Sequence, residues 1–437
     1  MTPGARLQAA IDILTSIAGT STPADRVFDA WARGSRFAGS KDRAAVGELV
    51  FKVLRHRAEL IAAVGQDTPR LLAMSAMTLI DKVEADAVVA LANGTGHSPA
   101  ALEADEEVAL RAAALPNAAA PAHVRLNYPE WMHGEFVAAF GDRLESEMAA
   151  LMDRAPTDLR VNTLKGDREM ALEALAEAAV AVEATPLAPL GLRLTARANV
   201  QGMNAFRDGL IELQDEGSQL ACLLTAVEPG EQVVDLCAGG GGKALSLAAM
   251  MGNRGQIHAC DTDRRRLGKL MPRAQRAGAR NIQTRVITPE GFADGVDNDL
   301  VELADKMDRV LVDAPCSGTG AWRRSPDARW KLTPELLASY IVAQDEVLAR
   351  GALAVRPGGR LIYVTCSVLP SENEMRIEAF LRNRPDFSVA DWQAYWPEDV
   401  AAPNCTTGGP LRLSPASTGT DGFFVCILER TGPAETA

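Results

Sequence analysis

The 437-residue sequence lacks the features that mark membrane-spanning, secreted and disulfide-linked proteins. No apolar run approaches the roughly 18 residues that a spanning helix needs, and the N-terminus has neither a basic leader nor a cleavable apolar segment. The seven cysteines are odd in number and show no paired spacing, which argues against a disulfide framework and a zinc site. We therefore expect a monomeric cytoplasmic protein with no metal and no membrane partner, in which thiols stay reduced.

An excess of positive charge is also missing, since the net charge is −12. This balance disfavours nucleic acid as a partner, because lysine and arginine dominate phosphate binding. The basic residues nevertheless cluster: the segment from Arg264 to Arg285 holds eight of them and no acidic residue. Such a segment is typical of a surface that binds a nucleic-acid backbone, although a solvated helix face explains it equally well.

The length predicts two or three domains. In the first part, apolar residues between Val46 and Val64 recur at the three-and-four spacing of a helix, with Ser40 as the expected N-cap. We predict a helical bundle over residues 1–125, a small mixed α+β subdomain over 126–205 and a catalytic domain over 206–430.

The catalytic domain alternates strand-length apolar runs with helical stretches. The strands are expected at "QVVDLC", "QIHAC", "IQTRVI", "RVLVDA" and "RLIYVTC", and the helices near residues 243–252, 264–278 and 334–355. Strands buried on both faces and joined by helices predict a parallel, doubly wound, Rossmann-like sheet.

A glycine-rich turn follows the first of these strands, in "DLCAGGGGKA" from Asp235 to Ala244. Glycines between a strand and a helix let the backbone approach a ligand, and Asp261 at the end of the second strand can bind both hydroxyls of a ribose. These features predict a nucleoside-containing cofactor. They do not identify it, because the loop also satisfies the loose dinucleotide fingerprint of a nicotinamide enzyme.

Two cysteines follow neighbouring strands of the predicted sheet. Cys316 lies in "DAPCSGTG" after the fourth strand, and Cys366 lies in "VTCS" after the fifth. The carboxyl ends of such strands lie about 4.8 Å apart and border the ligand site. We therefore predict that both thiols face the cofactor loop.

Two thiols beside a nucleoside cofactor suit the methylation of a pyrimidine at carbon 5. A thiolate that adds to carbon 6 converts the ring into an enamine, which can accept a methyl group at carbon 5. A second group is then needed to help release the adduct. Gly318 and Gly320 leave room for a base that has been pulled from its stack.

The motifs "DLCAGGGGK", "DAPCSGTG" and "YVTCSVLPSENE" resemble those of the RNA cytosine-5 methyltransferases of the Nop/Sun type. The N-terminal helices are similar to the antitermination-factor-like bundle of bacterial small-subunit rRNA methyltransferases, and "LRVNTLK" to the family's RNA-recognition-like subdomain. The resemblance implies S-adenosylmethionine as cofactor, Cys366 as the nucleophile and Cys316 as the cysteine that assists release. The cofactor contacts that it implies are Cys237, Ala238, Gly239, Gly240, Gly241, Gly242, Lys243, Asp261 and Asp313.

This sequence departs from the family pattern at two places. Gly240 stands where the family loop usually has proline, which removes a rigid residue. After the third strand, where the family commonly has an aspartate near the adenine, this chain has Val286-Ile287-Thr288-Pro289-Glu290. Thr288 and Glu290 are the available substitutes, and the contact stays unassigned.

The resemblance implies methylation of carbon 5 of a cytosine in RNA, with 16S rRNA as the expected substrate. The alternatives are a tRNA cytosine-5 methyltransferase, a nicotinamide-dependent oxidoreductase and a non-catalytic rRNA-binding assembly factor. For RNA contact we expect the basic segment after Arg264 and the loop 321–331, whose Trp322 and Trp330 lie among arginines.

Overall fold

The computed structural model describes residues 1–293, 295–405 and 408–431, which group into two compact units. One unit contains Met1–Arg154 and Ala321–Pro334, and the other contains Ala155–Gly320 and Glu335–Ala437. The three predicted domain ranges stay a prediction. Among the described residues, no helix has the combination of length and apolar character that crossing a membrane requires.

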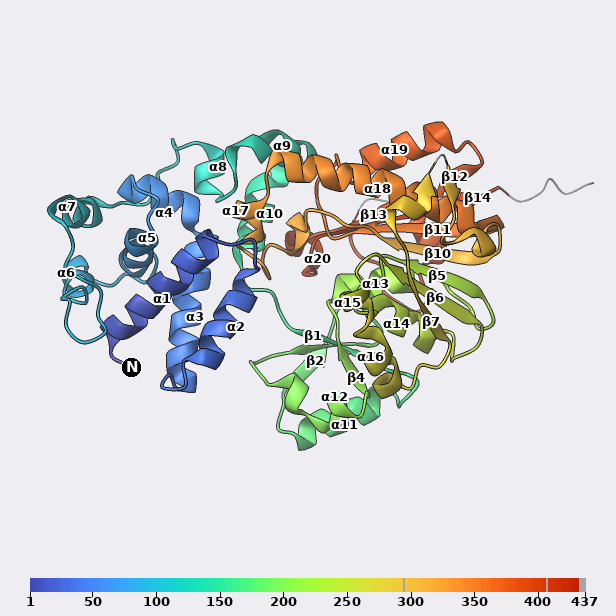
Figure 1. The fold of residues 1–437 in the computed structure, drawn as a ribbon, viewed down its shortest axis with the longest axis horizontal. Helices are drawn as coiled ribbons and strands as arrows, with labels where there is room; N and C mark the ends of the chain where they lie inside the picture. The colour runs from blue at the N-terminus through green and yellow to red at the C-terminus, as the bar shows by residue number, and fades with distance from the viewer. Residues whose placement is uncertain (294, 406–407, 432–437) are drawn as a thin grey trace, which may run out of the picture. The chain divides into compact units, whose positions relative to one another are not determined.

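The first unit is helical, as predicted (Figure 1). Its buried residues come from one stripe of each helix, including Val46, Val50, Val53 and Leu60 from the predicted apolar pattern. The Ser40 prediction was wrong: Gly39 is the N-cap of α3, and its backbone N–H donates to the Asp42 carboxylate (3.2 Å). The helices are α1 (Pro3–Ala18), α2 (Ala24–Gly34), α3 (Ser40–Arg55), α4 (Arg57–Val64), α5 (Pro69–Ser75), α6 (Ala85–Val89), α7 (Ala104–Ala112), α8 (Ala122–Arg125), α9 (His133–Phe140), α10 (Leu144–Met152) and α17 (Ala328–Lys331).

The second unit begins with a small α+β subdomain. Its antiparallel sheet has the strand order β2-β3-β1-β4, and β1 pairs on both sides, with β3 and with β4. Apolar residues of β1, β3 and α11 form its core. The elements are β1 (Asp158–Val161), α11 (Arg168–Glu177), β2 (Val182–Ala184), β3 (Gly191–Leu194), α12 (Asn204–Arg207) and β4 (Ile211–Leu213).

The rest of the unit is the predicted Rossmann-like domain, built on a sheet of order β12-β14-β11-β10-β5-β6-β7. Strands β5, β6, β7, β10 and β11 are parallel, and β12, β13 and β14 extend the sheet by antiparallel pairing. The strands are β5 (Gln232–Leu236), β6 (Gln256–Asp261), β7 (Ile282–Val286), β10 (Met307–Asp313), β11 (Val355–Thr365), β12 (Phe387–Ala390), β13 (Leu411–Leu413) and β14 (Phe423–Arg430), with a separate hairpin of β8 (Phe292–Ala293) and β9 (Val296–Asp297).

Helices cover both faces of this sheet (Figure 1). Because side chains alternate along a strand, Val310 and Val312 pack on the face covered by α18, whereas Leu311 packs on the face covered by α14. Each of these three side chains is fully buried and contributes roughly 1.5–3 kcal/mol to folding. The helices are α13 (Glu216–Leu223), α14 (Gly242–Met250), α15 (Arg264–Leu267), α16 (Leu270–Ala277), α18 (Pro334–Ala354), α19 (Glu374–Asn383) and α20 (Pro415–Thr418).

Candidate active site

The two cysteines lie at the carboxyl ends of adjacent parallel strands. Asp313 of β10 is in register with Val364 of β11, and Ala314 N donates to Val364 O (2.9 Å). Beyond the strands, Gly320 N donates to Cys366 O (2.9 Å), which joins the two loops. As a result, Cys316 Sγ and Cys366 Sγ are 3.5 Å apart, within hydrogen-bond distance for sulfur.

This contact changes the acidity of Cys316. The hydrogen bond to Cys366, followed by burial, raises the pKa of Cys316 well above its usual value. Cys316 therefore holds its proton tightly, while either sulfur can donate in the contact between them. Burial also raises the pKa of Cys260 to about 12 and that of Cys405 to about 11, which makes these sulfurs poor nucleophiles.

The glycine-rich loop connects β5 to α14 in a strained conformation. Gly239 and Gly241 have φ angles of +55° and +81°, and Cys237 also has a positive φ of +68°. A Cβ atom at Gly241 would lie 2.4 Å from Leu270 Cγ, so a side chain is excluded there. The loop thus exposes backbone where a larger side chain would obstruct a ligand.

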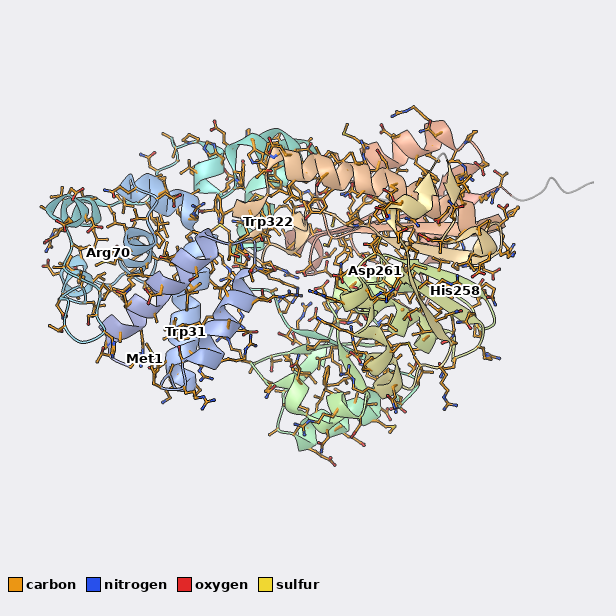
Figure 2. All side chains as sticks on the ribbon, viewed as in Figure 1. Met1, Trp31, Arg70, His258, Asp261 and Trp322 are labelled. Carbon is orange, nitrogen blue, oxygen red and sulfur yellow. The ribbon has the colours of Figure 1, made fainter. Side chains whose placement is uncertain are left out.

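Asp261, at the end of β6, holds this loop in place (Figure 2). Its carboxylate accepts hydrogen bonds from Gly239 N (2.7 Å) and from Asp263 N (2.7 Å). Gly240 stands where the family resemblance predicts proline. Its carbonyl oxygen accepts a hydrogen bond from Arg273 Nη1 (2.7 Å). A hydrogen bond from α16 therefore restrains the loop at the position that lacks proline.

Lys243 and Asp313 form an ion pair that joins the glycine loop to β10. Lys243 Nζ lies 2.6 Å from Asp313 Oδ2. Burial lowers the pKa of Lys243, but the combined effect of Asp313, through its charge and its hydrogen bond, and of Cys222 and Asp235 raises it overall. Lys243 is therefore a permanent cation beside the first turn of α14.

These residues fit S-adenosylmethionine, which carries a ribose diol and charged amino and carboxyl groups. The loop from Cys237 to Lys243 would supply exposed backbone to the cofactor, and Asp261 would supply the acidic group for the ribose. Thr288 and Glu290 lack a comparable arrangement for contacting the adenine. The Thr288 hydroxyl already donates to Asp299 (3.2 Å), and Glu290 is exposed. The adenine contact therefore stays unassigned.

A buried hydrogen-bond network behind the cysteines was missed by the sequence analysis. Glu372 lies after β11 and is fully buried. Its carboxylate accepts from Ser317 N (2.8 Å) and from Gln344 Nε2 (2.9 Å), and also from the hydroxyls of Ser317 and Ser367. The sequence signals were the positions of Ser317 and Ser367, each directly after a cysteine, and of Glu372 inside the motif "YVTCSVLPSENE".

The prediction that Trp322 stacks on RNA is wrong. Trp322, whose place is labelled in Figure 2, is fully buried. Its ring contacts Phe136 and the Arg329 guanidinium. Trp330 is half-buried, and its indole N–H donates to Leu54 O (2.6 Å). The tryptophans of this loop therefore pack with the N-terminal helices rather than form an exposed stacking platform.

The basic segment forms the short helices α15 and α16 instead of the single helix expected over 264–278. Arg273 and Arg276 both pair with the buried Glu212 of β4, so these two cations have a structural role. The remaining exposed cations on these helices and the turn that follows are Arg264, Arg265, Arg266, Lys269 and Arg280.

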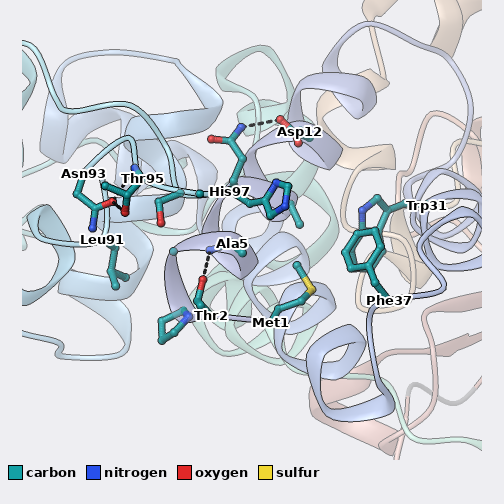
Figure 3. A pocket seen from close by; sticks show the side chains of 16 residues that line it. Met1, Thr2, Ala5, Asp12, Trp31, Phe37, Leu91, Asn93, Thr95 and His97 are labelled. Carbon is teal, nitrogen blue, oxygen red and sulfur yellow. Dashed lines mark hydrogen bonds between the residues drawn. The ribbon is translucent and has the colours of Figure 1, made fainter.

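The helical unit has a hollow of its own, with a volume of about 1020 Å³ (Figure 3). It is lined by residues of the N-terminus, including Met1, by Trp31 and Phe37, and by the turn that carries His97. No cysteine lines it, so it offers no thiol chemistry.

The chain resembles known methyltransferases in sequence and in fold. Residues 222–429 match the family model "16S rRNA methyltransferase RsmB/F", and residues 128–201 match a "Methyltr_RsmF/B-like, ferredoxin-like domain". A probable ribosomal RNA small subunit methyltransferase B of Synechocystis is 34% identical over 306 residues, which cover 70% of this chain and 67% of that protein.

Solved structures show the same fold. The crystal structure of PH0851 superposes with a TM-score of 0.75 at 24% identity and covers 98% of this chain and 99% of that chain. A methyltransferase homolog from Pyrococcus horikoshii has a TM-score of 0.59 at 28% identity and covers 70% and 97% of the two chains.

The Rossmann-like sheet and the glycine loop with its acidic partner define the class of S-adenosylmethionine-dependent methyltransferases. Within that class, the sequence matches settle the family. The chain belongs to the RsmB/F family of 16S rRNA methyltransferases.

Proposed function

We propose that this protein methylates carbon 5 of a cytosine in RNA, with 16S rRNA as the substrate, through a covalent adduct on Cys366. The observation that carries the proposal is the 3.5 Å separation of Cys316 Sγ and Cys366 Sγ at the strand ends beside the cofactor loop. The family description and the name of the Synechocystis relative support the choice of small-subunit rRNA.

The raised pKa of Cys316 supports Cys366 as the nucleophile. Because Cys316 holds its proton tightly, we assign the attacking thiolate to Cys366. Cys366 Sγ forms a bond to carbon 6 of the base, and the displaced electron pair makes carbon 5 nucleophilic. S-adenosylmethionine supplies the electrophilic methyl group for carbon 5.

Release of the product requires loss of the carbon 5 proton and of the sulfur. Once Cys366 is bound to the base, the thiolate that keeps Cys316 protonated is gone, so Cys316 ionises more readily. Cys316 first gives its proton to solvent, and its thiolate then accepts the carbon 5 proton. The electrons of the broken C5–H bond restore the C5–C6 double bond and expel Cys366 as thiolate.

Other residues of the site bind and orient. Asp313, fixed by Lys243, lies at the end of the strand that leads to Cys316, where it would contact the methyl donor beside the target base. The loop 237–243 and Asp261 hold the cofactor. Because these groups are fixed before binding, little reorganisation is needed at the moment of reaction.

Tritium release tests the reaction position. The protein is incubated with S-adenosylmethionine and small-subunit rRNA that carries tritium at carbon 5 of its cytosines. We expect one tritium released for each methyl group transferred, and 5-methylcytidine in the nucleoside digest. Methyl transfer without tritium release would contradict carbon 5 as the acceptor, and transfer to tRNA but not to rRNA would contradict the substrate.

A further inference from the structure

Glu372 connects the two cysteine loops through hydrogen bonds to residues adjacent to each thiol. Ser317, directly after Cys316, donates to the Glu372 carboxylate through both its backbone N–H (2.8 Å) and its hydroxyl. Ser367, directly after Cys366, donates to it through its hydroxyl. One carboxylate thus contacts both sides of the thiol pair.

Further contacts extend this link to the residue before Cys316. Gln344 of α18 donates through Nε2 to Glu372 (2.9 Å) and also to Pro315 O (2.9 Å). Tyr363 of β11 donates its hydroxyl to the Glu372 carbonyl (2.7 Å). The Glu372 side chain is therefore held from α18 and from both cysteine loops, and its own backbone is held by β11.

The side-chain partners of Glu372 are neutral: one backbone amide, one carboxamide and two hydroxyls. A fully buried carboxylate is costly to remove from water, even when it is well hydrogen-bonded. A glutamine has one acceptor oxygen for these four donors, so the donor set itself suits a carboxylate. The charge of Glu372 also acts on the thiol pair, where it disfavours ionisation of Cys316.

We propose that Glu372 is a positioning residue for the thiol pair: it fixes the spacing of Cys316 and Cys366 and, through its negative charge, keeps the proton on Cys316. This inference rests on the proposed function, because it assigns Cys366 as the sulfur that must carry the charge. The titratable groups that interact electrostatically with Cys316 are Cys366, Glu372, Tyr340 of α18 and Tyr363 of β11. Among them, Glu372 is the carboxylate.

The direction of the Cys316 shift agrees with this role. The hydrogen bond to Cys366 is the largest cause of the raised pKa of Cys316, and the charge of Glu372 adds to it. Loss of that charge should lower the pKa of Cys316 and let both sulfurs compete for the proton.

The test compares Glu372→Gln with the matched control Glu374→Gln, whose acidic side chain pairs with Arg412 instead. Alkylation of Cys316 by iodoacetamide is followed peptide by peptide by mass spectrometry across a pH series. We expect the alkylation midpoint of Cys316 to fall by about one pH unit in Glu372→Gln and to stay at the wild-type value in Glu374→Gln. An unchanged midpoint in Glu372→Gln would overturn the proposal.

This measurement needs neither RNA nor methyl transfer, so it fails or succeeds independently of the proposed reaction. Turnover provides the second readout: Glu372→Gln should lower kcat about tenfold or more with little change in KM for RNA and cofactor. A kcat equal to that of Glu374→Gln would overturn a role in the reaction.

A double variant provides a second test that does not depend on the folding of Glu372→Gln. Ser317→Ala with Ser367→Ala removes both hydroxyl donors but keeps the carboxylate and its bonds to Ser317 N and Gln344. It should lower kcat while the alkylation midpoint of Cys316 stays within a fraction of a pH unit of wild type. A midpoint that falls as far as in Glu372→Gln would show that geometry, not charge, keeps the proton on Cys316.

Discussion

At the carboxyl end of β5, Asp235 is buried beside the Lys243–Asp313 pair. Burial, with a further contribution from the charge of Asp313, raises its pKa to about 7. The folded protein therefore binds a proton at Asp235 more tightly than the unfolded chain does. This contribution to stability is fully present below about pH 4 and is lost as the pH rises toward 7.

Asp235→Asn should remove this pH dependence. Because asparagine does not ionise, the variant should lose less stability than the wild type between pH 4 and pH 7, by up to about 4 kcal/mol for a three-unit shift. Urea unfolding across that range measures the difference. Parallel stability curves for variant and wild type would contradict a raised pKa at Asp235.

The positions of some site residues could be predicted from the sequence, and those of others could not. The proximity of Cys316 and Cys366 could be predicted because strand order alone brings the ends of β10 and β11 together. Glu372 could not, because a glutamate in a polar run before a helix is normally solvated. Only the folded chain shows that its carboxylate is buried among donors from two loops.

In the glycine loop between β5 and α14, the backbone conformation limits which residues can replace glycine. Gly241→Ala would need a left-handed φ of +81° and would place Cβ against Leu270. We expect it to lower the free energy of unfolding by about 1–3 kcal/mol and to weaken S-adenosylmethionine binding.

Gly242→Ala is the matched control for stability. Gly242 begins α14, its φ is not positive, and a Cβ there meets no other atom within 4 Å. Its unfolding midpoint in urea should stay close to that of the wild type. Equal destabilisation by the two variants would contradict the loop conformation described here.

The segment 321–334 is an element whose environment the sequence did not reveal. Arg329 is fully buried, and its guanidinium donates to Asn127 O (2.6 Å) and Leu151 O (3.4 Å) and stacks on Trp322 at 4.6 Å. Burial, with the nearby charge of Arg55, lowers the pKa of Arg329 to about 9, so it is still charged at neutral pH. Arginine and tryptophan are equally typical of an RNA-binding loop, which is why composition misled the prediction.

Arg329→Gln should destabilise the helical unit by about 2–4 kcal/mol, because glutamine leaves buried carbonyl groups without donors. Hydrogen exchange should accelerate in residues 127–151. Arg36→Gln, at an exposed position of the same helical unit, serves as the control and should change exchange little. Equal exchange rates in the two variants would contradict the buried role of Arg329.

For the whole molecule, the parallel sheet was predictable because long apolar strands and helices alternate regularly. The short strands β4, β12 and β13 were not predicted, because segments of three or four residues carry too little periodicity. Helix 264–278 was expected to be continuous, but it is interrupted at Gly268 and Lys269. Both residues keep right-handed backbone angles, and Pro272 lacks the N–H that a continuous helix would donate to Gly268 O.

Local charge should decide RNA affinity, despite the net charge of −12. Arg264, Arg265 and Lys269 are exposed on α15 and the turn that follows. Replacing all three by glutamine should weaken rRNA binding and reduce the slope of log affinity against log salt by about 2. Filter binding across a salt series measures this change.

A second triple variant with the same change in net charge is the control. Lys306, Arg356 and Arg382 are also exposed cations of the same unit but lie outside the basic helices. Replacing them by glutamine should leave the slope close to that of the wild type. A similar loss of slope in both triple variants would mean that net charge, rather than the α15–α16 surface, governs binding.

The most direct test of the account is the covalent intermediate itself. Each cysteine is replaced by alanine, the protein is incubated with labelled small-subunit rRNA and S-adenosylmethionine, and the products are separated on a denaturing gel. Cys316→Ala should accumulate a protein–RNA adduct, whereas Cys366→Ala and the double variant should form none and should transfer no methyl group. An adduct in Cys366→Ala that disappears when Cys316 is also replaced would contradict the assignment of Cys366 as the nucleophile.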